Sequence, residues 1–171
     1  MLICRSVTGI PGLVWLCALL FVQVGAARAQ QQSFGEWGLA CQALGPGQTR
    51  CALFQRVLRD GNTLVLEAQV LGLETGADQA LAITTPLGVW LEAGVTIRID
   101  GGEAVSQSFQ TCATRGCIAR FEAPELLSQL DAGSEVAITY ATGREETQRV
   151  SLTLSLIGIR EGVAAIRQAN Q

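Results

Sequence analysis

Of the six cysteines in this chain, the four that follow the first 29 residues have the chemistry that is easiest to assign. They are Cys41, Cys51, Cys112 and Cys117. An even number of cysteines is typical of disulfides in proteins that leave the cytoplasm. Four cysteines allow three pairings, and we predict the local one, Cys41 with Cys51 and Cys112 with Cys117, because each pair flanks the turn of a predicted hairpin. Loops of this size should each stabilise the fold by about 2–3 kcal/mol.

Other uses of these cysteines fit their spacing less well. Nine residues separate the first two and four separate the second two, whereas zinc sites usually contain pairs spaced C-x₂-C. The Cys112 and Cys117 spacing also differs from the C-x-x-C of thiol-redox proteins. We therefore predict structural disulfides and no metal, and keep a thiol-redox protein as a third hypothesis that titration of free thiols would test.

Two residue types that support much of enzyme chemistry are missing. The chain contains no histidine and no lysine. The lack of histidine excludes Ser-His-Asp and Cys-His catalysis and the usual catalytic zinc ligands, and the lack of lysine excludes Schiff-base and Ser-Lys catalysis. We expect no catalytic residues, no cofactor and no enzymatic activity.

Carboxylates leave one enzymatic alternative, a hydrolase that acts on envelope glycans with two acidic residues. Such an enzyme needs a cleft with two carboxyl groups about 5–9.5 Å apart. The neighbouring Glu145 and Glu146 should point to opposite sides of a strand, which suits a charged hairpin tip better than an acid–base pair.

Trp90 is the candidate binding residue. We predict a strand over residues 87–91 with Val89 and Leu91 facing the core, so that Trp90 faces outward. An exposed tryptophan often anchors a partner. The alternative is that Trp90 covers the rim of its own sheet or packs under a loop.

The first 29 residues have the pattern of a secretory signal peptide. Arg5 precedes a mostly apolar stretch, and Ala27 and Ala29 supply the small residues that signal peptidase requires. The apolar run is short for a membrane anchor, and no basic residues follow it. Leu16 is too large for the lipoprotein cleavage that Cys17 would need. We predict cleavage after Ala29, no integral membrane span afterwards, and a periplasmic or secreted protein.

The remaining residues 30–171 are mildly acidic. Arg5 and Arg28 leave with the signal peptide, so ten arginines face fifteen acidic residues and the formal net charge is −5. A binder of nucleic acid or of an anionic membrane surface needs clustered basic residues. We therefore expect neither nucleic acid nor a polybasic membrane contact.

Short alternating segments dominate residues 30–171. Apolar and polar residues alternate most regularly over 150–156, where Ser151, Thr153 and Ser155 should face solvent. Turn residues separate such segments throughout, and the predicted strands are 36–41, 51–58, 63–71, 80–84, 87–91, 95–100, 135–140 and 150–156, together with the hairpin closed by Cys112 and Cys117. This pattern predicts a mainly β, single-domain antiparallel β-sandwich or open barrel.

Two short helices complete the prediction. Pro124 and Glu125 favour a helix start, which predicts a helical turn near 124–131. Ile159, Val163 and Ile166 have helical spacing and predict a C-terminal helix near 158–168.

Several short motifs, taken together, give the chain a family resemblance. They are Trp37-x₃-Cys41, Cys51, Pro86-Leu-Gly-Val89, Gly94-Val95, Asp100, Phe109-x-x-Cys112, Gly116-Cys117 and Ser155-Leu-x-Gly158. In this order they resemble the invasion-associated locus B (IalB) family over nearly all of residues 30–171. Ile159 stands where that family is expected to have phenylalanine, which keeps the position apolar.

The resemblance implies an exported, mainly β bacterial protein of the envelope, associated in some members with entry into host cells. It supplies no catalytic residues. With the composition, it favours a disulfide-stabilised, non-enzymatic binding protein whose partner is an unidentified envelope or host-surface component.

Overall fold

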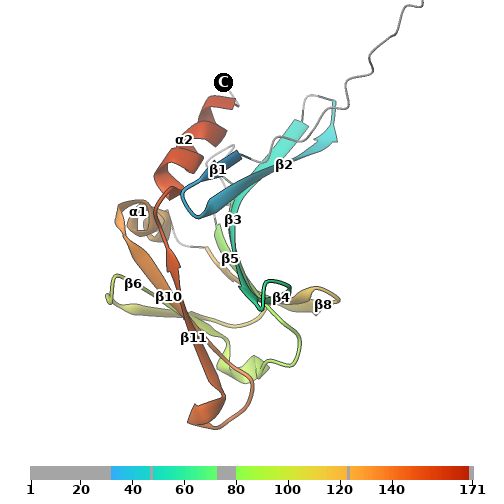
Figure 1. Cartoon of the computed structure of the whole chain (residues 1–171), viewed down its shortest axis with the longest axis vertical. Coiled ribbons are helices and arrows are strands. Elements are labelled where there is room, and N and C mark those ends of the chain that lie inside the picture. The colour runs from blue at the N-terminus through green and yellow to red at the C-terminus, as the bar shows by residue number, and fades with distance from the viewer. Residues whose placement is uncertain (1–31, 47, 73–79, 123, 170–171) are drawn as a thin grey trace, which may run out of the picture.

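Eleven strands form two antiparallel sheets in the computed structural model, which describes residues 32–46, 48–72, 80–122 and 124–169 (Figure 1). The larger sheet contains, in spatial order, Gln32–Phe34 (β1), Trp37–Gly45 (β2), Gln48–Arg59 (β3), Thr63–Leu71 (β4), Ala80–Thr85 (β5), Gly116–Phe121 (β9) and Thr111–Ala113 (β8). The smaller contains Arg149–Ser155 (β11), Glu135–Ala141 (β10), Val95–Ile99 (β6) and Ala104–Gln107 (β7). The mainly β prediction is confirmed, as a two-sheet sandwich.

The hairpins follow from turn residues that suit the twist of paired strands. Between β3 and β4, Asp60 and Gly61 both have positive φ, 53° and 75°, and the Asn62 N–H donates to the Arg59 carbonyl at 3.2 Å. Two consecutive residues with positive φ form the two-residue turn that matches the right-handed twist of a hairpin.

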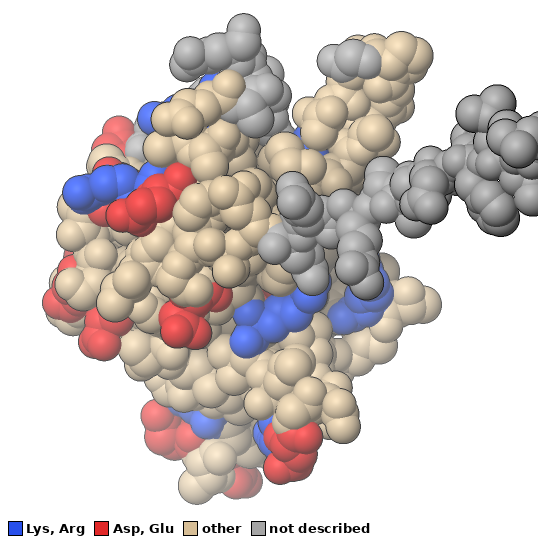
Figure 2. Space-filling view, turned by 45° about the horizontal axis from the view of Figure 1, so that its top comes forward, with Lys and Arg blue, Asp and Glu red and all other residues tan. Residues whose placement is uncertain are grey.

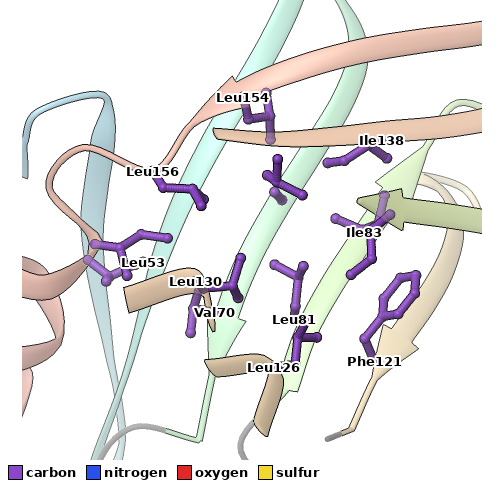
Figure 3. Packing of buried hydrophobic residues seen from close by; sticks show 14 of the residues in the cluster. Leu53, Val70, Leu81, Ile83, Phe121, Leu126, Leu130, Ile138, Leu154 and Leu156 are labelled. Carbon is purple, nitrogen blue, oxygen red and sulfur yellow. The ribbon is translucent and has the colours of Figure 1, made fainter. Parts of the chain in front are cut away.

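The apolar face of each sheet packs against the other to form one core (Figure 3). Ile138 and Leu154 of the smaller sheet lie opposite Ile83 of the larger one. The largest fully buried side chains are Trp37, Phe121, Leu53, Leu66, Leu81, Ile83, Ile97, Leu130, Ile138, Ile159 and Ile166. The predicted alternation of β11 is confirmed, because Leu154 is buried while Ser151 and Thr153 are exposed.

One buried tyrosine joins the two sheets through a hydrogen bond. The Tyr140 hydroxyl, on β10, donates to the Val65 carbonyl of β4 at 3.1 Å. Burial raises the pKa of Tyr140 above its ordinary value of 10.0, and the positive charge of Arg59 opposes part of that rise. The hydroxyl therefore stays protonated in the folded protein at pH values that ionise a free tyrosine.

Both predicted helices are present and complete the core. Helix α1 (Pro124–Ala132) directs Leu126 and Leu130 into the sandwich. Helix α2 (Ile159–Ala169) buries Ile159 and Ile166, and its Gly162 lies directly against the Leu53 side chain. Neither helix is long and apolar enough to cross a bilayer, and this statement covers only the described residues.

The predicted strand over residues 87–91 is wrong. Pro86 has no N–H for the ladder and Gly88 has φ 91°, so the chain leaves the sheet and forms the short 3₁₀ helix η1 (Leu91–Ala93). Val89 packs against the core as expected, but Leu91 is 53% exposed rather than core-facing.

Two edge strands were not predicted. Gln32–Phe34 precedes the first predicted strand and pairs with β2 as β1. Ala104–Gln107 pairs with β6 as β7 although all four of its residues are exposed. The predicted signal peptide, 1–29, lies outside the described residues.

Candidate interaction surface

The structure contains both of the cysteine pairs that the sequence favoured. Cys41 is bonded to Cys51 and Cys112 to Cys117, and in each pair the Cα atoms are 4.0 Å apart. In each pair the two cysteines are direct partners across a two-strand antiparallel ladder, where opposite Cα atoms are about 4.5–5.5 Å apart. Within the described residues, no cluster of three or more metal-ligating side chains is present.

The two disulfides serve hairpins that differ in their surroundings. Beyond Leu39, β2 loses its pairing with β1, and β3 pairs with β4 only from Leu53 onwards. Residues 40–46 and 48–52 therefore form a projecting ribbon, which we call the β2–β3 arm (Figure 1). By contrast, β9 is paired along its length with β5, so the β8–β9 hairpin is held by the body of the sheet.

Most of the sequence motifs have structural roles. Adding a Cβ to Gly94, Gly116 or Gly158 would place it under 3.0 Å from a backbone carbonyl oxygen of another segment, and all three have positive φ. The Asp100 carboxylate accepts hydrogen bonds from the backbone N–H groups of Ser134 and Glu135 at 3.0–3.1 Å. These residues hold neighbouring segments together and are not arranged as a reactive site.

Trp90 packs beside a second loop, the one that carries Arg144. The backbone N–H of Trp90 donates to the Ala141 carbonyl at 2.8 Å. The guanidinium carbon of Arg144 lies 5.8 Å from the centre of the indole ring. The indole is half-buried. Cation–π contact of this kind favours the observed orientation of both side chains.

The loop that carries Arg144 is itself ordered by local hydrogen bonds. Glu145 begins the 3₁₀ helix η2 (Glu146–Gln148), and its backbone N–H donates to the Gln148 side chain at 3.2 Å. Glu146 pairs with Arg149 at 2.7 Å. Glu145 and Glu146 thus lie at a charged hairpin tip, as the sequence predicted.

Two large apolar side chains beside Trp90 are exposed to solvent. Leu87 is 58% exposed and Leu91 is 53% exposed. Together with Trp90 and Arg144 they define what we call the Trp90 surface, at the end of the molecule where the 86–94 segment and the β10–β11 turn meet (Figure 1). Exposed apolar side chains on an ordered frame are typical of interaction sites.

A cleft of about 420 Å³ opens elsewhere, between the two sheets. Its described lining comes from three separate segments of the chain: Gly35, Glu36, Gln55, Arg56, Val57, Thr153, Leu154, Ser155 and Ile157. Glu36 is the one carboxylic residue among them, whereas the two-carboxylate hydrolase requires a pair. The geometry of this cleft therefore gives that alternative no support.

Charge is distributed without a dominant sign on the face shown in Figure 2. Acidic and basic side chains are interspersed there among wide uncharged areas. Arg56 pairs with Glu67, and Arg120 pairs with Glu122 at 3.1 Å. The charges of Arg56 and Arg120 are thus matched locally.

Comparisons with known proteins agree with the fold and the motifs. The family model described as "Invasion associated locus B (IalB) protein" matches residues 37–167. The invasion protein B homologues of Brucella abortus strain 2308 and of biovar 1 strain 9-941 are each 26% identical over 137 residues, which cover 78% of this chain and 77% of the relative. The crystal structure of invasion associated protein B from Bartonella henselae superposes with a TM-score of 0.64 at 20% identity, over 80% of this chain and 93% of that one.

Proposed function

Because the chain belongs to the invasion-associated locus B family, we propose that it is an exported, non-enzymatic binding protein of the bacterial envelope. Two disulfides support an oxidising compartment, since such bonds persist outside the cytoplasm. The signal-peptide pattern of residues 1–29 supports export. The proposed location is the periplasm or the exterior of the cell.

The Trp90 surface is the observation on which the binding role depends. Leu87 and Leu91 leave more than half of their surface in water, whereas the backbone beneath them is fixed by the hydrogen bond from Trp90 to Ala141. A partner that covers both leucines gains hydrophobic free energy without ordering the loop first. We propose that this surface contacts a protein of the envelope or, in keeping with the relatives' names, of a host-cell surface.

Site-specific photo-crosslinking in native cell envelopes tests this role. A photoreactive residue at position 87 or 91 should give a discrete cross-linked product, while the same residue at position 105 should not. Val105 is a matched control, because it is an apolar side chain 40% exposed on strand β7, outside the 86–94 segment.

The cross-linked partner then allows a direct affinity measurement. The double variant Leu87→Ser with Leu91→Ser should weaken its binding at least tenfold, since each leucine contributes on the order of 1 kcal/mol. Products of equal yield from positions 87 and 105, or none from 87 and 91, would refute the proposed surface.

A further inference from the structure

The free edge of β11 has unpaired backbone groups beside the cleft. In the smaller sheet β11 is an edge strand, with β10 on one side only. The Leu156 N–H donates to the Ser134 carbonyl on the β10 side at 2.9 Å. Because successive residues of a strand direct their N–H and C=O groups to opposite edges, Ser155 and Thr153 must direct theirs away from β10.

A tryptophan side chain confirms that direction and covers the first position of the edge. The Trp37 indole N–H donates to the Ser155 carbonyl at 2.8 Å, which is the place a neighbouring strand would otherwise occupy. Two residues earlier, Thr153 is exposed and lines the cleft. Within the described part of the chain, the Thr153 N–H and C=O on this edge have no hydrogen-bond partner.

Apolar groups form part of the cleft and of its rim. Val57 and the buried Leu154 supply apolar lining, while Ile157 is 69% exposed beside them. An exposed isoleucine next to an apolar pocket is well placed to contact a side chain that enters it. A volume of about 420 Å³ lies in the range that small ligands or a few side chains occupy.

The cleft is lined by one acidic and one basic residue, Glu36 and Arg56, and only the basic one has an ion-pair partner among the described residues. Arg56 is matched by Glu67, which also accepts a hydrogen bond from Gln69 at 2.6 Å. Glu36 is exposed at the rim and forms no ion pair with the described residues. A bound group of opposite charge would therefore complement Glu36.

We propose that this cleft binds an extended peptide segment that adds to β11 as a further strand and pairs a basic side chain with Glu36. The Thr153 N–H and C=O would exchange hydrogen bonds with the peptide backbone, which is how exposed sheet edges capture peptides. The apolar lining takes a neighbouring side chain on the same face of the peptide. This site is separate from the Trp90 surface, so an experiment that refutes one of the two proposals does not refute the other.

The test uses a defined probe, the pentapeptide acetyl-VTKTV-amide, whose valines lie on the same face as its lysine, titrated into the oxidised protein and followed by amide NMR shifts. Binding should shift the amides of Gly35, Val57 and Thr153. The same peptide N-methylated at alternate residues should bind at least tenfold more weakly, because the methyl groups remove its edge donors. Replacing its lysine by norleucine should weaken binding about two- to fivefold, as expected for an exposed ion pair.

Variants of the protein separate the two contributions. Thr153→Pro removes the edge N–H but leaves the β10 ladder intact, and proline is tolerated on an edge strand, so it should weaken binding at least tenfold. Glu36→Gln should cause the same two- to fivefold loss as norleucine, whereas Glu92→Gln, at an exposed carboxylate elsewhere, should cause none. The Ile157→Ser variant changes an exposed side chain, so it should fold normally and bind the peptide about threefold more weakly or worse.

Three results would overturn the inference. The first is equal affinity for the plain and N-methylated peptides. The second is shifts confined to the Trp90 surface. The third is a dimer of this chain that Thr153→Pro abolishes while the peptide does not bind, since the edge would then take a second copy instead.

Discussion

The two disulfide-closed hairpins use the same covalent bond in opposite surroundings. In the β8–β9 hairpin, Gly116 lies against the backbone of Thr85, so the turn is fixed by the sheet as well as by the disulfide. In the β2–β3 arm, residues 40–46 and 48–50 are all exposed, and no neighbouring strand pairs with its outer part. A disulfide therefore reinforces a packed turn in one place and in the other supplies much of the order of a projecting ribbon.

Glycine substitution should expose this difference most strongly. Gly116→Ala would put a Cβ under 3.0 Å from the Thr85 carbonyl oxygen at a φ of 138°, so we expect a loss of about 2–4 kcal/mol in unfolding free energy. Gly45→Ala in the arm meets no atom within 4 Å and should stay within about 0.5 kcal/mol. Urea denaturation of the oxidised proteins measures both. Equal losses of unfolding free energy in the two variants would show that the β2–β3 arm is packed as tightly as the β8–β9 hairpin.

Removal of each disulfide should have the next largest effect. The sequence separations are 10 for Cys41–Cys51 and 5 for Cys112–Cys117, so chain entropy gives losses of about 3 and about 2 kcal/mol for the paired Cys→Ser variants. Each hairpin offers trypsin one exposed arginine, Arg50 or Arg115.

Proteolysis then separates local from global loosening. Cleavage after Arg50 should rise sharply in the Cys41→Ser, Cys51→Ser variant, because little else holds the arm. Cleavage after Arg115 should rise less in its counterpart, because β9 keeps its pairing with β5. The unreduced wild-type protein should titrate no free thiol among these four cysteines, and a thiol signal would instead favour the redox hypothesis.

The body can also be weakened while both hairpins remain intact. Tyr140→Phe leaves the buried Val65 carbonyl without its donor and should cost about 1–2 kcal/mol near neutral pH. The raised pKa of Tyr140 means that the wild type has its full tyrosine contribution below pH 10 and loses it as pH rises from 10 towards the folded-state pKa.

The stability of the wild type and of Tyr140→Phe at alkaline pH can be compared directly in this protein. The chain has one tyrosine and no lysine, so Tyr140→Phe should show little change in stability over the pH range in which the wild type declines. Denaturation at several pH values, with tyrosinate absorbance as a second signal, measures this. Parallel curves for the two proteins would contradict the role assigned to Tyr140.

Periodicity and cysteine spacing predicted most of the framework. The alternation in 150–156, the helical spacing of Ile159, Val163 and Ile166, and the two cysteine pairs depend on local sequence, which is why they could be read directly. The 87–91 segment misled because an apolar run does not reveal its conformation, and Pro86 and Gly88 decide the backbone there. Strand β7 was not predicted because an exposed edge strand has no buried face and so no regular alternation of apolar and polar residues.

The cleft could not have been predicted in the same way. Its lining joins residues 35–36, 55–57 and 153–157, which meet only when the two sheets stack. Trp90 was identified as a candidate, but its contact with Arg144 across another loop depends on tertiary structure. Local sequence thus described the elements, while the surfaces between distant elements required the fold.

The position of α2 also bears on the order in which the molecule can assemble. Ile159 and Ile166 belong to the core, and Gly162 lies against Leu53 from the first half of the chain. During synthesis, Leu53 therefore emerges more than a hundred residues before the helix that covers it. A chain in this state has an incomplete interior, so the core of the sandwich can close only after the last segment of the chain has been synthesised.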